Sequence, residues 1–245
     1  MKKLLLIVPA FNEEKNLPEL VNKINEVQNT MPIKVDTLII NDFSTDNTKE
    51  VLKTLKNINF INLPCNLGIG GAVQTGYKYA KENDYDYAIQ IDGDGQHNPK
   101  YIKQAYEEIE KGYNFVIGSR FINNQGFQSS FVRRLGINFF YYLIRILTRE
   151  KITDATSGFR LCDKKVIDLF SRYYPADYPE PETLMILISN GFKVTEIPVI
   201  MNEREHGKSS INVVNSIYYM IKVTTAILLS FSLKKKVKNW MKYSK

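Results

Sequence analysis

Short apolar runs alternate with helix-like stretches over the first 120 residues of the chain. The runs have the length of buried strands and cover residues 4–8, 37–40, 60–63, 87–91 and 115–118. Between them, apolar residues recur at helical spacing. This alternation predicts an α/β fold with a mostly parallel sheet and helices on both faces. In such sheets, ligands bind beyond the carboxyl ends of the strands.

The second half of the chain is less regular. Residues 121–130 are a polar segment long enough to be a lid. Further elements are expected at residues 131–149 (helix), 154–161 (turn and strand), 182–190 (helix), 193–200 (strand) and 213–233 (helix). No repeat or linker interrupts the pattern. We therefore predict one Rossmann-like domain over residues 1–212, followed by a C-terminal amphipathic helix and basic tail over residues 213–245.

Composition narrows the class of protein. The chain has 245 residues, 44% of them hydrophobic and 24% charged, which is typical of a globular protein. Its two cysteines, Cys65 and Cys162, lie far apart, which excludes a disulfide framework or a zinc finger and fits a reducing compartment. The first apolar run is too short for a signal peptide, so we expect a cytoplasmic location.

The net charge of +7 is concentrated at the C-terminus. The last twelve residues hold six lysines and no acid, which leaves the rest close to neutral. This pattern argues against nucleic acid and favours an anionic membrane surface, where each lysine contributes about 1 kcal/mol. Lys222 and neighbouring polar residues interrupt the helix over 213–233, so we expect it to lie at the interface, with the 131–149 helix as a second contact. The alternatives are a solvated tail and helices that pack on the body or form a homo-oligomer.

Pro9, Phe11 and Glu13 follow the first apolar run. An aromatic ring and a carboxylate at a strand end could flank and hydrogen-bond a flat polar ring. The alternative is an ordinary helix start with Asn12 as the N-cap.

Asp42 follows the second run, where its carboxylate could accept hydrogen bonds from a base or a ribose hydroxyl. The alternative is that Thr45 or Asp46 merely caps the next helix. The glycine-rich stretch at residues 66–71 matches no phosphate-loop pattern and is interpreted as the tight entry to a closely packed helix.

Asp92 and Asp94 are the strongest chemical signal. They emerge from a buried strand and are separated by Gly93, which frees the backbone to turn both carboxylates to one point. Hard oxygen ligands of this kind suit Mg²⁺ or Mn²⁺ bridged to substrate phosphates. The alternative is a polar turn.

Two cationic segments follow later strands. Arg120 comes after the fifth run, and residues 203–210 contain Arg204, Lys208 and Ser209. Opposite an acidic metal pair, these segments would clamp a diphosphate; otherwise they are surface charges. No serine lies in a GxSxG elbow, which excludes hydrolase chemistry of that type.

These motifs, with the segment from Asp154 to Arg160, resemble family 2 glycosyltransferases of the GT-A fold, and most closely the dolichyl- and polyprenyl-phosphate sugar transferases. The resemblance implies that Pro9, Phe11, Glu13 and Asp42 hold the nucleoside. It implies a metal site at Asp92, Asp94 and Gln96. It also implies substrate contacts from Asp92, Gly93, Arg120, Arg204, Lys208 and Ser209, with Asp94 and Arg204 taking part in catalysis.

Three departures from the family pattern affect these expectations. Ser210 replaces a usual lysine, for which Lys208 is the expected substitute. Phe43 replaces a usual glycine, so we expect a different turn there. Residues 178–182 replace a catalytic Glu-Asp pair, so the general base is not carried over; Asp154 and Glu182 are our candidates.

The predicted activity is inverting transfer of a hexose from a UDP- or GDP-linked donor to a polyprenyl phosphate. Such an acceptor needs no base, because its phosphate is already largely anionic near pH 7. Alternatives are transfer to a hydroxyl of a cell-surface polysaccharide or lipid-linked glycan, and a non-catalytic nucleotide-sugar-binding scaffold. The intact aspartate pair weighs against the scaffold. By resemblance, a small membrane protein is a further expected partner.

Overall fold

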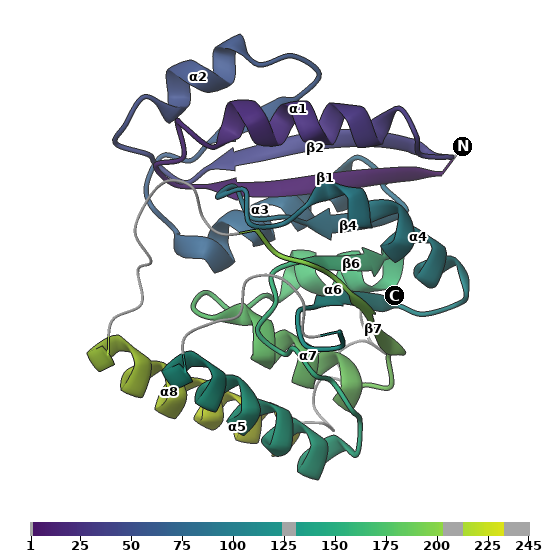
Figure 1. Cartoon of the computed structure of the whole chain (residues 1–245), viewed down its shortest axis with the longest axis vertical. Helices are drawn as coiled ribbons and strands as arrows, with labels where there is room; N and C mark the ends of the chain where they lie inside the picture. Colours follow the sequence, from purple (N-terminus) through teal and green to yellow (C-terminus); the bar gives the residue numbers. More distant parts are fainter. Residues whose placement is uncertain (1, 124–130, 203–212, 233–245) are drawn as a thin grey trace.

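The computed structural model of the chain describes residues 2–123, 131–202 and 213–232. These residues form a seven-stranded sheet with the order β3-β2-β1-β4-β6-β5-β7 (Figure 1). Its strands are β1 (Lys3–Ala10), β2 (Lys34–Asn41), β3 (Asn59–Asn62), β4 (Tyr87–Gln90), β5 (Phe115–Ser119), β6 (Arg160–Asp163) and β7 (Val194–Pro198). β6 is antiparallel to β4 and β5, and all other neighbours are parallel. The predicted mostly parallel α/β sheet is confirmed.

The helices of the described residues are α1 (Leu17–Gln28), α2 (Thr48–Thr54), α3 (Gly68–Glu82), α4 (Ile102–Glu110), α5 (Phe131–Thr148), α6 (Lys164–Arg172), α7 (Pro179–Ser189) and α8 (Val213–Ser232), with a 3-10 turn at Pro99–Tyr101. Our sequence analysis missed α6. Its signal was Asp163, an N-cap whose carboxylate accepts from the Val166 amide at 3.0 Å. The strand expected over 154–161 begins only at Arg160, because side-chain bonds hold the preceding residues in a loop.

Both faces of the sheet are buried. Along β1, Leu4, Leu6 and Val8 belong to one apolar cluster and Leu5 and Ile7 to another, as the alternation of a strand requires. The first cluster packs α1 and α4 on the sheet. The second packs α3, α6 and α7, and reaches α5 and α8. The carboxyl ends of the central strands are therefore presented by a sheet that is covered on both sides.

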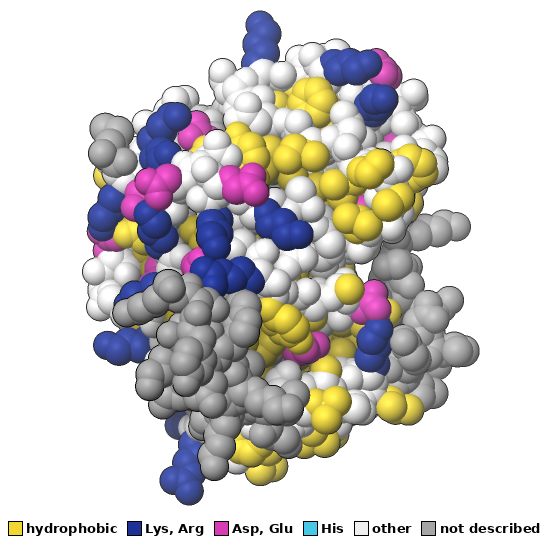
Figure 2. All heavy atoms as spheres, turned by 180° about the vertical axis from the view of Figure 1, so that it is seen from behind, with side chains coloured by type: hydrophobic (Ala, Val, Ile, Leu, Met, Phe, Trp, Pro, Cys, Tyr) yellow, Lys and Arg dark blue, Asp and Glu magenta, His cyan; other side chains and the backbone are white. Residues whose placement is uncertain are grey.

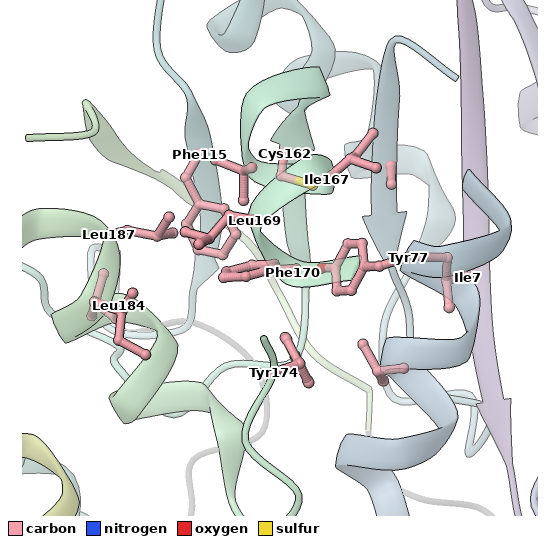
Figure 3. Close-up of a cluster of buried hydrophobic side chains, with 14 of the residues drawn as sticks. Ile7, Tyr77, Phe115, Cys162, Ile167, Leu169, Phe170, Tyr174, Leu184 and Leu187 are labelled. Carbon is pink, nitrogen blue, oxygen red and sulfur yellow. The ribbon is translucent and has the colours of Figure 1, made fainter. Parts of the chain in front are cut away.

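The second cluster has an aromatic centre. Figure 3 shows Tyr77 of α3 and Phe170 of α6 facing one another, with ring centroids 5.2 Å apart. The entry to α3 is tight, as predicted: a Cβ on Gly70 would lie 2.1 Å from the Pro175 carbonyl oxygen. This close approach joins the start of α3 to the segment before α7, through a bond from the Gly70 amide to the Ala176 carbonyl.

α5 and α8 lie side by side at the lower end of the molecule (Figure 1), where the rings of Phe140 and Tyr219 meet at 5.5 Å. Each helix has a row of exposed apolar side chains. The exposed row comprises Leu135, Phe139, Tyr142 and Ile146 on α5, and Ile221, Leu228 and Leu229 on α8. Among the described helices, none combines the length and apolarity needed to cross a membrane. This finding agrees with the prediction from the polar interruptions in α8.

Charges of both signs share the face opposite to that of Figure 1. Figure 2 shows lysine and arginine side chains interspersed with acidic ones there, and hydrophobic side chains at its lower end. The ion pairs of α3 and α6 include Lys81 with Asp168 at 2.7 Å and Lys164 with Asp84 at 2.6 Å. The described part of this face therefore presents no uniform basic field.

Candidate active site

The loops after β1 and β2 are joined by side-chain hydrogen bonds. The Asn12 side-chain oxygen accepts from the Thr45 amide at 2.8 Å, and the Ser44 hydroxyl accepts from the Asn12 amide at 2.9 Å. Asn12 has a φ of 58° and α1 begins only at Leu17, so its interpretation as an N-cap was wrong. Asp46 does bond to the Thr48 amide at the start of α2. Asn12 instead holds the two strand-end loops together.

Asp42 lies at the base of these loops and is 3% exposed. Its carboxylate accepts from the Leu67 amide at 2.7 Å, and its carbonyl accepts from the Asn66 side chain at 3.1 Å. Phe11 and Phe43, both exposed, belong to these loops, and the exposed Leu67 lies in the segment between β3 and α3. A buried carboxylate with exposed apolar neighbours is an arrangement suited to a flat heterocycle with polar edges.

Phe43 corrects one expectation. Its φ is 61°, in the left-handed region that glycine favours. The turn after Asp42 thus has the backbone conformation that a glycine there would adopt readily, and the substitution does not require a different turn. A bulky residue in this conformation is uncommon and costs on the order of 1–2 kcal/mol.

The predicted metal residues share one turn after β4. Asp94 is 6% exposed, and its carboxylate accepts a hydrogen bond from the Gln96 amide at 3.0 Å. The Asp92 carboxylate accepts one from the Gln90 side chain at 3.2 Å. A Cβ on Gly93 would lie 2.9 Å from the Pro9 carbonyl, so the turn passes close to β1. The positive φ of the turn, 76°, is at Gly95. Gly93 therefore allows the turn to pass close to β1, and Gly95 allows the backbone to change direction.

This donor set fits Mg²⁺ or Mn²⁺. It comprises two carboxylates and the Gln96 amide, whose nitrogen donates to the Asn202 carbonyl at 3.4 Å and whose oxygen is the atom suited to an ion. Within the described ranges, no group of three or more His, Cys, Asp or Glu side chains is placed to hold a metal alone. Mg²⁺ is commonly held by one or two carboxylates and completed by water and substrate phosphates.

Arg120 and Asp154 form a buried, two-pronged ion pair. The Arg120 Nε and Nη2 atoms each donate to a carboxylate oxygen of Asp154 at 2.7 Å, and the Arg120 amide donates to the same carboxylate. Burial opposes the charge of Arg120, but the bonds to Asp154 outweigh it and raise the Arg120 pKa. This geometry favours Asp154 as the group that orients Arg120 over a role as general base.

Glu196 of β7 supports this pair and was missed in the sequence analysis. Its carboxylate accepts from the Thr153 amide at 2.7 Å, the Thr153 hydroxyl at 2.9 Å and the Asp154 amide at 2.8 Å. Burial raises the pKa of Glu196. The only local signal was a single acid within the strand expected over residues 193–200. Glu196 thus fixes the loop from which Asp154 reaches Arg120.

Glu182 lies in the first turn of α7, half-buried. The Tyr173 hydroxyl donates to its carboxylate at 3.1 Å, and burial raises the Glu182 pKa. Arg160, fully buried, connects this turn to the loop before β6 by donating to the carbonyls of Glu180 and Ala155 at 2.9 Å each. A carboxylate with a raised pKa is suited to proton exchange, so Glu182 remains our candidate for that role.

A half-open cavity that the sequence analysis did not predict lies between α5 and two residues, Phe121 and Thr153, that are the sequence neighbours of Arg120 and Asp154. It has a volume of about 190 Å³ and is lined by Phe121, Arg134, Ile137, Asn138, Tyr141 and Thr153. In the sequence, the cavity could have been anticipated from the spacing of Arg134, Asn138 and Tyr141, which places three polar groups on one helix face. This α5 cavity combines an arginine with aromatic and aliphatic walls. Such a lining suits an anion attached to a hydrocarbon.

Three of the predicted site residues, Arg204, Lys208 and Ser209, lie outside the described residues, as do residues 124–130 of the expected lid and the six terminal lysines. The remaining candidates, except Glu182 on α7, come together in two groups. Pro9, Phe11, Glu13, Asp42, Asp92, Gly93, Asp94 and Gln96 follow β1, β2 and β4. Arg120 and Asp154 form the second group, next to the α5 cavity.

Comparison with known proteins agrees with this arrangement. The chain is 31% identical over 221 residues to UDP-N-acetylglucosamine–dolichyl-phosphate N-acetylglucosaminyltransferase of Methanococcus voltae, covering 81% of this chain and 85% of the relative. It is 27% identical over 228 residues to polyprenol monophosphomannose synthase of Mycolicibacterium smegmatis, covering 89% and 84%. The resemblance to the polyprenyl-phosphate branch is thereby confirmed.

Solved structures confirm the fold. Glucosyl-3-phosphoglycerate synthase from Mycobacterium tuberculosis, in complex with Mn²⁺, UDP and phosphoglyceric acid, superposes with a TM-score of 0.69 at 14% sequence identity, over 94% of this chain and 78% of that chain. The sequence profile of glycosyl transferase family 2 matches residues 5–170, which contain the sheet edge with Asp42, Asp92 and Asp94. The chain belongs to glycosyl transferase family 2.

Proposed function

We propose that this protein transfers a hexose, with inversion, from a UDP- or GDP-linked donor to a polyprenyl phosphate at the cytoplasmic face of a membrane. The observation that carries the proposal is the α5 cavity, which Arg134 lines together with Phe121 and Thr153, the sequence neighbours of the paired Arg120 and Asp154. One relative is named for dolichyl phosphate and the other for polyprenol monophosphomannose, which supports this acceptor.

The residues divide into three tasks. Phe11 and Asp42 would hold the nucleoside of the donor. Asp92, Asp94 and Gln96 would hold Mg²⁺ or Mn²⁺, which when bound neutralises charge on the diphosphate leaving group. Support for this metal comes from the chemistry of the donor set, and the structural neighbour with Mn²⁺ and UDP has the same fold.

The acceptor phosphate would be oriented by Arg134, with Arg120 as a fixed charge nearby. A phosphate monoester is largely anionic near pH 7, so positioning is sufficient and no proton need be removed. Inversion then requires attack on the anomeric carbon from the side opposite to the diphosphate. Glu182 would matter only for a hydroxyl acceptor, which needs a base.

The exposed apolar rows of α5 and α8 support contact with a membrane. On α5 the exposed side chains recur at spacings of three and four residues, and on α8 Leu228 and Leu229 follow Ile221 by seven and eight residues, so each set shares one helix face. In the sequence, α8 is followed directly by the lysine-rich tail. An apolar face next to cationic residues is typical of helices that lie in an anionic interface.

The acceptor is tested with purified protein, a panel of UDP- and GDP-sugars, Mn²⁺ or Mg²⁺, and three acceptors: a short polyprenyl phosphate, the corresponding polyprenol and a glycan. We expect a glycosyl phosphoryl polyprenol with the phosphate alone. Transfer to the glycan and not to the lipid phosphate would overturn the proposed acceptor. Donor binding without any transfer would favour a scaffold.

Replacing Asp42 by alanine is expected to weaken donor binding about 10- to 100-fold, because a charge-assisted hydrogen bond contributes about 1.5–3 kcal/mol. The dissociation constant of UDP, measured by calorimetry, checks this. Asp42→Asn is the matched variant, since it keeps an oxygen for the Leu67 amide. An unchanged UDP affinity in Asp42→Ala would remove Asp42 from the donor site.

Replacing Ile146 by glutamate is expected to weaken binding to anionic vesicles about tenfold. Ile146 is 76% exposed, and burying such a side chain in an apolar phase contributes about 1.5–3 kcal/mol. Co-sedimentation with vesicles measures the effect. Thr54→Glu on α2, an exposed site at the opposite end of the molecule in Figure 1, makes the same charge change and should have little effect. Equal losses in both variants would contradict a specific membrane face.

A further inference from the structure

Two amides attach the turn that carries the aspartate pair to the sheet. The Ile91 amide donates to the Ile7 carbonyl at 3.0 Å, and the Gly93 amide donates to the Pro9 carbonyl at 3.2 Å. Both acceptors belong to β1. Successive amides of an extended chain point in opposite directions, so the Asp92 amide between them points away from β1.

On that other side the neighbouring strand is β6, and its pairing with β4 ends at Gln90 and Arg160. The ladder therefore has no further position for the Asp92 amide. A backbone N–H next to the protein interior needs an acceptor. Here the acceptor is a side chain: the Asp92 amide donates to His97 Nδ1 at 3.0 Å.

His97 is well placed to act as a fixed acceptor. It is 4% exposed, and its ring meets the buried ring of Phe159 edge-on, with centroids 6.0 Å apart. Because Nδ1 accepts a hydrogen bond, it carries no proton, and the neutral ring must have its hydrogen on Nε2. The bond closes the turn across its whole length, from Asp92 to His97. Asp92, Asp94 and Gln96 all lie within the turn that is closed in this way.

We propose that His97 is a positioning residue for the divalent cation, acting through Nδ1 on the Asp92 amide without touching the ion. By closing the turn, it directs the carboxylates of Asp92 and Asp94 to the same side. The inference rests on the proposed metal dependence of the enzyme. Groups that orient metal ligands in this indirect way commonly change metal affinity about 10- to 100-fold when they are removed.

Two variants separate this role from simple packing against Phe159. His97→Leu keeps an apolar side chain of similar bulk but removes the acceptor. His97→Asn loses the ring but places an oxygen close to the former position of Nδ1. The readout is the dissociation constant of Mn²⁺ in the presence of UDP, measured by electron paramagnetic resonance. We expect His97→Leu to weaken Mn²⁺ binding about 10- to 100-fold and His97→Asn to remain within about threefold of the unsubstituted protein.

The opposite patterns would overturn the inference. Mn²⁺ affinity in His97→Leu within twofold of the unsubstituted protein would show that the bond does not matter. A loss in His97→Asn as large as in His97→Leu would assign the effect to packing. Absence of Mn²⁺ binding by the unsubstituted protein is a separate result, which would overturn the metal dependence itself and the inference with it.

Nitrogen NMR provides a readout that does not depend on the metal. The chain has only two histidines, so a His206→Gln variant leaves the His97 ring as the sole imidazole signal. We expect a neutral ring with hydrogen on Nε2 and an unprotonated Nδ1. A ring with its hydrogen on Nδ1 would contradict the bond from the Asp92 amide.

Discussion

Replacing Asp94 by asparagine is expected to lower kcat for sugar transfer about 1000-fold while the protein stays folded. The substitution removes the charge of one proposed metal ligand but keeps an oxygen for the Gln96 amide. A bound cation contributes several kcal/mol of charge stabilisation in the transition state, and each 1.36 kcal/mol is about a factor of ten in rate. Steady-state kinetics with saturating Mn²⁺ and donor measures the effect.

The control for this prediction is Glu108→Gln, an equivalent change in a carboxylate on α4. Glu108 forms an ion pair with Lys111 and is not one of the proposed site residues. Its kcat should match that of the unsubstituted protein. Thermal unfolding of both variants shows whether the fold is intact. Near-normal activity of Asp94→Asn, with metal present, would mean that the aspartate pair is not the metal site.

Replacing Arg134 by glutamine is expected to lower kcat/KM for the polyprenyl phosphate about 100-fold and to leave water-driven hydrolysis of the donor unchanged. Arg134 is the cation of the α5 cavity, and it has no place in the donor loops after β1 and β2. A hydrogen bond to a charged group contributes about 1.5–3 kcal/mol, equivalent to about 10- to 150-fold in kcat/KM. Comparing transfer with hydrolysis separates acceptor binding from donor binding.

Arg149→Gln is the matched control, because Arg149 is exposed just beyond the end of α5 and does not line the cavity. It removes the same charge from the same end of the molecule, so any general effect of charge on lipid binding appears in both variants. The prediction is contradicted if donor hydrolysis falls with transfer, or if Arg149→Gln loses as much activity as Arg134→Gln.

Arg120 differs from Arg134 in what its removal would show. Its guanidinium is held by Asp154, and Asp154 is held in turn by Arg120 and by the loop that Glu196 supports. Removing one member of a buried pair leaves an uncompensated charge and costs about 3–5 kcal/mol of stability. Loss of activity in an Arg120 variant would therefore combine unfolding with a change at the site. Arg134, which is exposed, provides the cleaner test of the acceptor.

The described structure confirms those features of the sequence analysis that depend on local pattern. The five apolar runs became β1 to β5, and the segment over 193–200 contains β7. Asp42, Asp92 and Asp94 were found at the carboxyl ends of parallel strands because each follows its strand directly. The errors also concerned local pattern. The alternative interpretation of Asn12 as a helix cap was wrong, and helix α6 was missed.

The sequence by itself determined the strands β1 to β5 and their mostly parallel arrangement, the edge at which the polar loops gather, and the residue types present there. These follow from periodicity and from the order of motifs, which are properties of neighbouring residues. Only the tertiary structure decided that Arg120 is held by Asp154, that Glu196 supports the Asp154 loop, that α5 and Thr153 line a half-open cavity, and that His97 accepts from the Asp92 amide. The physical reason is that Arg120 and Asp154 are 34 residues apart in the sequence and meet only in the folded chain. They meet because β6 is antiparallel to β5, which brings the loop before β6 to the end of β5.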